Sequence, residues 1–301
     1  MKKIICFVLA ALLLALPCLA VNPIDTERAC SLTLQYKRGE VFYGGVEVKV
    51  FMIAEASADG SYDMTGAFKA YPVNIYGVSN QLEWKNISDT LASYAVADKL
   101  EPDCKAIADN EGKVRFDGLK AGLYLTLGVT VERDGETAVF ENFITALPTP
   151  AEEGEHSYDV TAYPKCSAFT PKDEPVEYKI VKHWKDEGYE DKRPDAIEVD
   201  ILCNNEVVYS EKLTRDNDWS FAWTADDGGV WQAVERNVPE GYTVTVDNSA
   251  KTIIVTNSFD YGQIPPPQTG DTAVIWPYAI VMAIGGALML TVSVWRRRRE
   301  A

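Results

Sequence analysis

The sequence predicts an all-β protein of two β-sandwich domains in tandem, the first with one inserted helix. Short runs rich in β-branched and aromatic residues, separated by Gly, Asp and Asn, dominate both halves of the chain. About 250 residues lie between the two terminal apolar segments, which is enough chain for two domains. Pro171 and Pro175 separate the two series of runs, so we expect domains at residues 27–166 and 176–259, joined by a linker at 167–175.

Alternating apolar residues place the strands of the first domain. Between them, Trp84 and Leu91 belong to a helical repeat that predicts a helix from Leu82 to Ala97 and should point inward. Ser79 or Asn80 could cap the N-terminus of this helix. The strands expected in this domain include residues 32–36, 46–51, 113–116, 123–127 and 158–163.

The N-terminus has the features of a secretory signal peptide. Lys2 and Lys3 precede an apolar segment, and small residues follow it up to Ala20. We therefore expect residues 1–20 to be removed on export. Lipidation at Cys18 is an alternative, which the preceding proline disfavours.

The C-terminus has the features of an extended spacer followed by a membrane anchor. Residues 260–271 are rich in proline, which favours a stiff and extended chain. The apolar segment 272–295 is long enough for a transmembrane helix across a hydrocarbon core of about 30 Å. The arginines of the basic tail 296–301 should keep that end in the cytoplasm.

A short peptide before this segment has the order of a sorting signal. It consists of Pro266, Pro267, Gln268, Thr269 and Gly270. The peptide resembles the LPxTG motif of sortase-anchored Gram-positive surface proteins, with proline where leucine is usual. The resemblance implies that sortase cuts between the threonine and the glycine and joins the threonine to a peptidoglycan cross-bridge or to a pilin lysine. The alternative is a plain single-span membrane protein.

Three polar residues interrupt otherwise apolar strand faces in the second domain. Residues of the same parity share one face of a strand, and this rule places Lys182, Glu235 and Asn257 on apolar faces. Burying one of them alone would cost on the order of several kcal/mol. Together they can satisfy one another, so we expect the three side chains to meet in one core.

The same three side chains could carry out a reaction. Burial lowers the pKa of a lysine and raises the pKa of a glutamic acid. A neutral Lys182 amine could then attack the Asn257 carboxamide, while protonated Glu235 binds the carbonyl oxygen and relays a proton to the departing ammonia. The product would be an isopeptide bond between the first and last strands, which closes a long loop.

Separated motifs occur in order through the second domain. They are Lys182-His-Trp184, Lys192-Arg-Pro194, Asn217-Asp-Trp219, Glu235 with Val238-Pro-Glu-Gly-Tyr242, and Val255-Thr-Asn-Ser-Phe259. Over about residues 176–259 they resemble the Cna B-type domain of bacterial surface proteins. In that family a lysine, an asparagine and an acid at the matching positions form a crosslink. The resemblance therefore implies those roles for Lys182, Asn257 and Glu235.

The end of the first domain resembles a different motif. Val160-Thr-Ala-Tyr-Pro-Lys165 is similar to the pilin motif whose lysine accepts the sortase-bound thioester of the next subunit. Cys166 replaces the usual asparagine, and His156 stands where tryptophan is common. Lys165 could be a polymerisation acceptor or a plain exposed lysine leading into the linker. The two resemblances together imply a pilin-like first domain and two Ig-like or prealbumin-like β-sandwiches.

The first domain lacks the residues for a crosslink of its own. Its opening strand resembles that of pilin-type relatives, but Tyr36 stands where their reactive lysine would be. Lys37 is one position away and on the opposite face of the strand. We therefore expect no crosslink in this domain.

Composition and cysteine content limit the partners. The formal net charge is −16, and removal of both terminal segments makes the remainder more acidic, which argues against nucleic acid or anionic lipid. Cys30, Cys104, Cys166 and Cys203 remain after export, without metal-binding spacing, so we expect no metal and no cofactor. One disulfide among the first three is possible, with its pairing open. Cys203 should face the core as a small hydrophobe.

These features favour a cell-surface protein without enzymatic activity on other molecules. The chain has no phosphate loop and no nucleophile elbow. We expect a wall-anchored adhesin or accessory pilin-like subunit, inserted in the membrane through its C-terminal helix before sorting. Its distal first domain could bind a host or extracellular-matrix ligand. The alternatives are a polymerising pilus backbone subunit linked through Lys165, or a plain single-span membrane protein.

Overall fold

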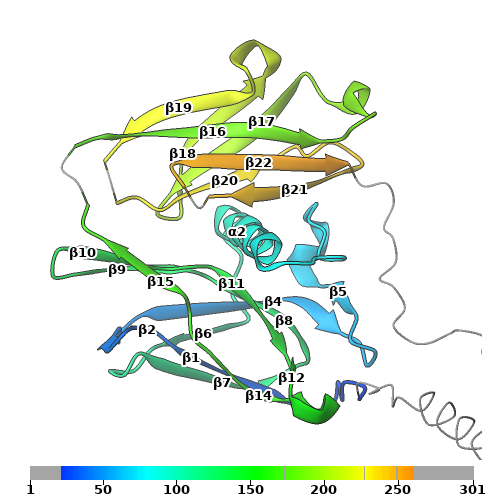
Figure 1. The fold of residues 1–301 in the computed structure, drawn as a ribbon, viewed down its shortest axis with the longest axis vertical. Coiled ribbons are helices and arrows are strands. Elements are labelled where there is room, and N and C mark those ends of the chain that lie inside the picture. Colours follow the sequence, from blue (N-terminus) through cyan, green and yellow to red (C-terminus); the bar gives the residue numbers. More distant parts are fainter. Residues whose placement is uncertain (1–21, 172–173, 227, 249, 260–301) are drawn as a thin grey trace, which may run out of the picture. The chain divides into compact units, whose positions relative to one another are not determined.

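The computed structural model describes residues 22–171, 174–226, 228–248 and 250–259. These residues lie in one compact unit. As the sequence predicts, they are mostly strands, with a single α-helix among them (Figure 1). The expected signal peptide, Pro-rich spacer, sorting motif, transmembrane segment and basic tail lie outside the described ranges. Within those ranges, no helix has the length and apolar character needed to cross a bilayer.

The first region, residues 22–171, contains several sheets, and its first strand pairs with a strand near its end. Its strands are β1 (Cys30–Gln35), β2 (Lys37–Arg38), β3 (Val41–Phe42), β4 (Glu47–Ala56), β5 (Tyr62–Met64), β6 (Cys104–Ile107), β7 (Lys113–Leu119), β8 (Gly122–Thr126), β9 (Val129–Arg133), β10 (Glu136–Phe140), β11 (Phe143–Leu147), β12 (Thr149–Pro150), β13 (His156–Ser157), β14 (Asp159–Ala162) and β15 (Cys166–Phe169). In one sheet, β1 lies between antiparallel β7 and parallel β14. A second sheet has the order β11-β8-β4-β5, with β6 also paired to β4, and a third has the order β15-β10-β9. Strand β15 therefore extends the first region into the stretch expected to be linker.

A continuous cluster of buried side chains joins the strands of the first region. Leu32 and Leu34 of β1 and Val48 of β4 are fully buried in it. Tyr36, which directly follows β1, is also buried and packs edge-to-face on Phe140 with 5.0 Å between ring centroids. Removal of one apolar face of each strand from water is the main force that assembles these alternating sequences.

The second region, residues 174–259, is a two-sheet sandwich. Its strands are β16 (Val176–Lys185), β17 (Ala196–Cys203), β18 (Glu206–Thr214), β19 (Ser220–Ala225), β20 (Trp231–Glu235), β21 (Tyr242–Asp247) and β22 (Thr252–Phe259). One sheet has the order β19-β16-β22-β21 and the other β18-β17-β20. The first and last strands, β16 and β22, are parallel neighbours. Ile180, Ile197 and Val255 lie fully buried between the sheets. Strands β20 and β21 are end strands of their sheets.

Helix α2 (Gln81–Ala97) has the capping pattern that its sequence predicts. Asn80 accepts a hydrogen bond from the main-chain N–H of Glu83 at 3.0 Å, and the Glu83 carboxylate accepts one from the Ser79 N–H at 2.8 Å. This reciprocal arrangement satisfies N–H groups that the helix itself cannot pair. Asn80 is therefore the cap. Short 3-10 helices lie elsewhere, at η1 (Gly66–Ala70), η2 (Glu152–Gly154), η3 (Glu190–Lys192) and η4 (Arg215–Asn217).

Helix α2 is buried on more than one side. Every residue from Ile87 to Ala95 is buried, including the polar residues Ser88, Asp89, Thr90 and Ser93. The helix contacts β8 and β11 of the first region and also β20 and β21 of the second, beside which it lies in Figure 1. Leu91 is fully buried as expected, whereas Trp84 is only partly buried. The sheets of both regions thus pack against the same helix.

Replacement of Leu91 by alanine tests this packing. Leu91 is 0% exposed, so Leu91→Ala should lower the free energy of unfolding by about 2–5 kcal/mol through lost burial and the cavity it leaves. Leu82→Ala is the matched control, because Leu82 is on the same helix and is 59% exposed. Its effect should stay within about 0.5 kcal/mol. Urea unfolding of both variants makes the comparison, and equal losses would contradict the observed burial of α2.

Candidate crosslinking site

The structure brings together the three polar residues that interrupt apolar strand faces. Lys182 lies on β16, Asn257 on the neighbouring β22, and Glu235 on β20 of the other sheet. The Lys182 Nζ donates to Glu235 Oε2 at 3.0 Å, and the Asn257 Nδ2 donates to Glu235 Oε1 at 2.8 Å. The Glu235 carboxyl therefore bridges the amine and the carboxamide.

Strand geometry explains this meeting. In the parallel pair β16–β22, Lys182 lies opposite Val255 and Trp184 lies opposite Asn257, so the amine and the carboxamide are neighbours along one inward face. Glu235 reaches them from the other sheet. The exposed fractions are 5% for Lys182 and 0% for both Glu235 and Asn257, so the sandwich excludes water from all three groups.

Burial changes the acid–base character of the pair. Loss of hydration lowers the pKa of Lys182 from 10.5 to about 8, although the Glu235 carboxylate opposes this change. Burial likewise raises the pKa of Glu235 above 4.5, against the opposing effect of the Lys182 ammonium. Both shifts favour the neutral amine and the neutral carboxylic acid, which are the forms that acyl transfer to the amine requires.

The carboxamide of Asn257 has an unused acceptor. Its Oδ1 is buried and has no hydrogen-bond partner among the described residues, while its Nδ2 donates to Glu235. A carbonyl oxygen left unpaired in this way costs roughly 1–3 kcal/mol. Protonation of Glu235 together with rotation of the amide would let the acid donate to Oδ1 and polarise the carbonyl carbon toward the amine.

Aromatic side chains close the site around the amine. The Lys182 Nζ lies 4.5 Å from the centroid of the Trp184 ring. Trp184 in turn packs edge-to-face on Trp219 and Tyr242, with 5.3 and 5.4 Å between ring centroids. Trp184 is thereby held in place over the amine.

A second buried acid, which was not predicted from the sequence, lies beside the site. Asp186 is 1% exposed, accepts a hydrogen bond from the Tyr242 hydroxyl at 2.8 Å and forms an ion pair with Arg193. The hydrogen bond from the Arg193 guanidinium is the main cause that lowers the pKa of this carboxyl, so it stays ionised. Its burial could have been predicted, because residue 186 has the same parity as Lys182 and Trp184 and so belongs to the same inward face.

A similar arrangement of donors occurs in the first region. Asp89 accepts from the Lys85 Nζ and, at 3.0 Å, from the Asn142 Nδ2. Here, however, the Asn142 Oδ1 already accepts a hydrogen bond from the Gly128 N–H at 2.8 Å, and the Lys85 side chain is 24% exposed. The lysine is in contact with water and the carboxamide oxygen is already hydrogen-bonded. This group therefore suits a structural role in holding α2 better than a reactive one.

Other predicted residues lie apart from this site. Tyr36 is buried in the core of the first region, and Lys37 is exposed beside it. Lys165 is exposed at 79% of its side chain, and its Nζ lies 3.5 Å from the Glu141 Oε1. His156, in β13, contacts the Asn22 main-chain oxygen at 2.7 Å through its Nε2. The residues of the sorting motif lie outside the described ranges.

The thiols and possible metal ligands of the described residues form no further candidate site. The described cysteines are free thiols, and Cys203 is partly buried against the core, close to its expected environment. No group of three or more potential metal ligands occurs within the described residues.

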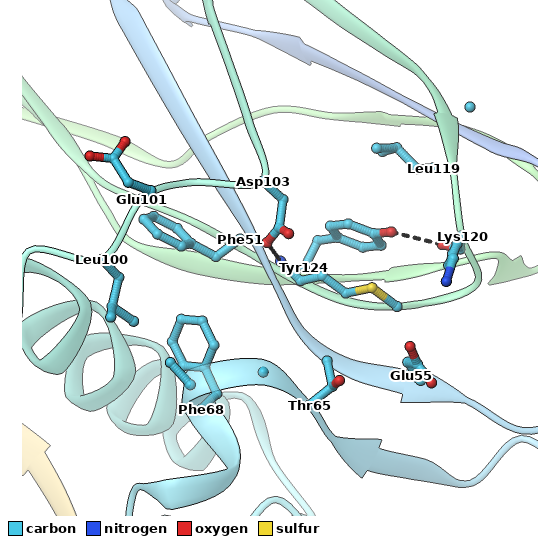
Figure 2. A pocket seen from close by; sticks show the side chains of 14 residues that line it. Phe51, Glu55, Thr65, Phe68, Leu100, Glu101, Asp103, Leu119, Lys120 and Tyr124 are labelled. Atoms are coloured by element: carbon cyan, nitrogen blue, oxygen red, sulfur yellow. Dashed lines mark hydrogen bonds between the residues drawn. The ribbon is translucent and has the colours of Figure 1, made fainter.

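A cavity of about 500 Å³ lies in the first region (Figure 2). Phe51, Phe68 and Tyr124 form much of its apolar wall. The Asp103 carboxylate accepts a hydrogen bond from the Met52 N–H at 2.7 Å, so this acid is engaged with the protein's own main chain. The remaining acidic residues of the wall are Glu55 and Glu101. We assign no ligand to this cavity.

Comparison with known proteins places one domain in a family. Residues 178–258 match the Cna protein B-type domain, so this part of the chain is a Cna B-type domain. No curated protein matches the chain. Its B-type match covers Lys182, Glu235 and Asn257, the residues that meet in the buried site.

Solved structures to which the chain is similar include surface proteins and pilins. A single B repeat unit of the collagen-binding surface protein Cna of Staphylococcus aureus is 14% identical, with 77% of this chain and 98% of that chain covered and a TM-score of 0.28. The major pilin SpaD of Corynebacterium diphtheriae is 16% identical, with coverages of 78% and 65% and a TM-score of 0.30. The shaft pilin SpaA of Lactobacillus rhamnosus GG is 16% identical, with coverages of 79% and 100% and a TM-score of 0.28.

The lowered pKa of Lys182 gives a pH dependence that can be measured. In an Asn257→Ala chain the amine stays buried but has no carboxamide to attack. Between about pH 8 and pH 10.5 the unfolded chain holds the lysine proton and the folded chain does not, so the free energy of unfolding should rise with pH. Urea unfolding across this window measures the slope.

The control for this measurement is a Lys182→Met, Asn257→Ala chain. It keeps Glu235 and all other titrating groups. Loss of the Lys182 ammonium raises the pKa of Glu235 further, and a raised carboxyl pKa makes the free energy of unfolding fall, not rise, with pH. The rise attributed to Lys182 should be absent from it. Identical pH profiles for the two chains would show that the lysine is not held in a dehydrated site.

Proposed function

We propose that this chain is a cell-surface protein whose Cna B-type domain is locked by an isopeptide bond between Lys182 and Asn257. The observation that carries the proposal is the Glu235 carboxyl, which is buried and hydrogen-bonded to both the amine and the carboxamide. A glutamate buried with a lysine and an asparagine is costly unless all three groups are paired. Their shared geometry suits a proton relay between a nucleophile and a leaving group.

The reaction has a balanced course. The neutral Lys182 Nζ attacks the Asn257 carboxamide carbon, while protonated Glu235 stabilises the developing oxyanion. The former amine gives up one proton to the carboxyl, and the departing Nδ2 takes one from it. The C–N bond to Nδ2 breaks, ammonia leaves, and a secondary amide joins Lys182 to Asn257. Glu235 ends the cycle in its starting protonation state, and neither a cofactor nor a metal is required.

The bond would stabilise the domain by restricting its unfolded chain. It closes a loop of about 75 residues, for which chain entropy predicts roughly 4 kcal/mol of stabilisation. The chemistry occurs once and acts on the protein itself, so the chain is not an enzyme toward other molecules. Its role is mechanical and adhesive.

The proposed place of the protein is the cell wall. A sortase would cut after Thr269 and join the chain to a peptidoglycan cross-bridge, with the Cna B-type domain as a stalk and the first region held distally. We propose an adhesin or accessory pilin-like subunit that presents its first region to a host or extracellular-matrix ligand. The B-type domain match supports this class, because proteins that bear such repeats include a collagen-binding surface protein.

A second candidate function is that of a polymerising pilus subunit. Lys165 favours it, since 79% of its side chain is exposed and its ion pair with Glu141 spans 3.5 Å. Such a lysine is open to acylation by the threonine of a following subunit. A plain single-span membrane protein is the remaining alternative.

Intact-mass spectrometry tests the crosslink. The folded full chain should weigh one ammonia less than its sequence, and Lys182→Ala or Asn257→Ala should restore the full mass. Each variant should also lose roughly 4 kcal/mol of unfolding free energy. Lys179→Ala is the matched control, since Lys179 lies on the exposed face of the same strand. An unreduced mass in the unaltered chain, or equal stability of Lys182→Ala and Lys179→Ala, would rule the bond out.

Mass spectrometry of the mature C-terminus tests the anchoring. Sortase transfer predicts a chain that ends at Thr269 in amide linkage. Linkage to a cross-bridge peptide indicates wall anchoring, whereas linkage to Lys165 of another copy indicates a pilus, and Lys165→Ala should then abolish the polymer ladder. Retention of Arg296–Arg299 in the mature protein would support the plain membrane anchor instead.

A further inference from the structure

The first region covers the open side of the Cna B-type sandwich. Strand β21 is an end strand, whose outward N–H groups would otherwise face water. The N–H of Val246 donates to the Thr90 Oγ1 of α2 at 2.7 Å, and the N–H of Val244 donates to the Pro72 main-chain oxygen at 2.7 Å. The sheet edge is therefore completed by residues from the first region.

Helix α2 also binds the main chain of Glu235, the acid of the candidate site. The Tyr94 hydroxyl donates to the Glu235 main-chain oxygen at 2.7 Å, in a contact where both residues are buried. The next residue, Arg236, donates to Asp98 at the end of α2 and to Asp200 of β17, each at 2.6 Å. Tyr94 and Asp98 are four residues apart and thus lie one helical turn apart on the same side.

Both faces of β20 are shielded from water. Glu235 and Ala233 face the sandwich core and are fully buried. Gln232 and Val234, which point to the opposite face, are 4% and 1% exposed, and α2 contacts this strand. Without α2, water would reach the strand that carries the acid, and its end would lose two fixed hydrogen bonds.

We propose that helix α2 of the first region positions Glu235 for the crosslinking reaction in the second, with Tyr94 as the principal positioning residue. This inference rests on the Lys182–Asn257 bond proposed above. The carboxyl must contact the amine and the carboxamide at once, and a misplacement of about 1 Å can slow such a reaction roughly 100-fold. The covalent lock then forms efficiently only in a chain whose two regions have already assembled.

Two tyrosine variants of the full chain make a matched comparison. Tyr94→Phe deletes the hydrogen bond to the Glu235 carbonyl. Tyr124→Phe deletes an equivalent bond, since the Tyr124 hydroxyl donates to the Lys120 carbonyl at 2.9 Å within the first region. Each chain is made by cell-free synthesis and quenched in acid at timed intervals, and intact mass gives the fraction that has lost ammonia.

Tyr94→Phe should slow ammonia loss by about fivefold or more, whereas Tyr124→Phe should match the unaltered chain. The pH profile separates positioning from general destabilisation. A displaced, hydrated carboxyl ionises more readily, so the acid limb of the rate, below which the amine and the carboxyl both hold protons, should move to lower pH in Tyr94→Phe. Destabilisation alone would lower the rate without moving that limb. Asp186, which also acts on Lys182, is the same in every chain.

The outcomes distinguish this inference from the proposed function. If the unaltered chain loses ammonia and the two tyrosine variants lose it equally fast, α2 does not position the acid, although the bond itself stands. If no chain loses ammonia, the crosslink and the positioning role both fail. Should Tyr94→Phe not fold, Asp98→Asn provides the same test, because it weakens the hold on Arg236 next to the acid and lies at a partly exposed site.

Discussion

The burial of an amine, a carboxyl and a carboxamide in one apolar core is the constraint on which the second region depends. Neither Lys182 nor Glu235 could remain charged and unpaired without water, so the two sheets must bring them within hydrogen-bonding distance. That requirement fixes the register of β16 against β22 and the approach of β20 from the other sheet. The proposed bond would convert a costly polar cluster into an uncharged amide.

A small β-sandwich has end strands with unpaired main-chain N–H and C=O groups, and in this protein the first region covers two of the end strands of the second. Strands β20 and β21 end their sheets, and helix α2 lies against both. Because α2 belongs to the first region, the second region completes its edge with residues far away in the sequence: Thr90 precedes Val246, whose N–H it binds, by 156 residues. The helix consequently carries buried polar groups, such as Thr90, that would be out of place in an ordinary amphipathic helix.

Strand parity and capping rules predicted much of this arrangement, and tertiary contacts account for what they missed. Lys182, Glu235 and Asn257 could be predicted because each breaks an alternating apolar pattern. The sequence placed the helix cap at Ser79 or Asn80, and the structure shows that it is Asn80. Burial of the polar side of α2 could not be predicted, because helical spacing identifies only the side that carries the apolar residues. Thr90 and Tyr94 are buried by strands that the local sequence does not contain. The pairing of Asp186 with Arg193 likewise depends on the conformation of the loop between β16 and β17.

The parallel pairing of β16 and β22 has a consequence for tension along the chain. A pull on the proposed C-terminal anchor would reach the domain through the end of β22, and a pull on the first region would reach it through the start of β16. With Lys182 bonded to Asn257, force would pass from residues 257–259 directly to residues 176–182. The chain between them, residues 183–256, would form a slack loop that bears none of the pull. The loops and turns of that segment could then change in sequence without weakening the tether.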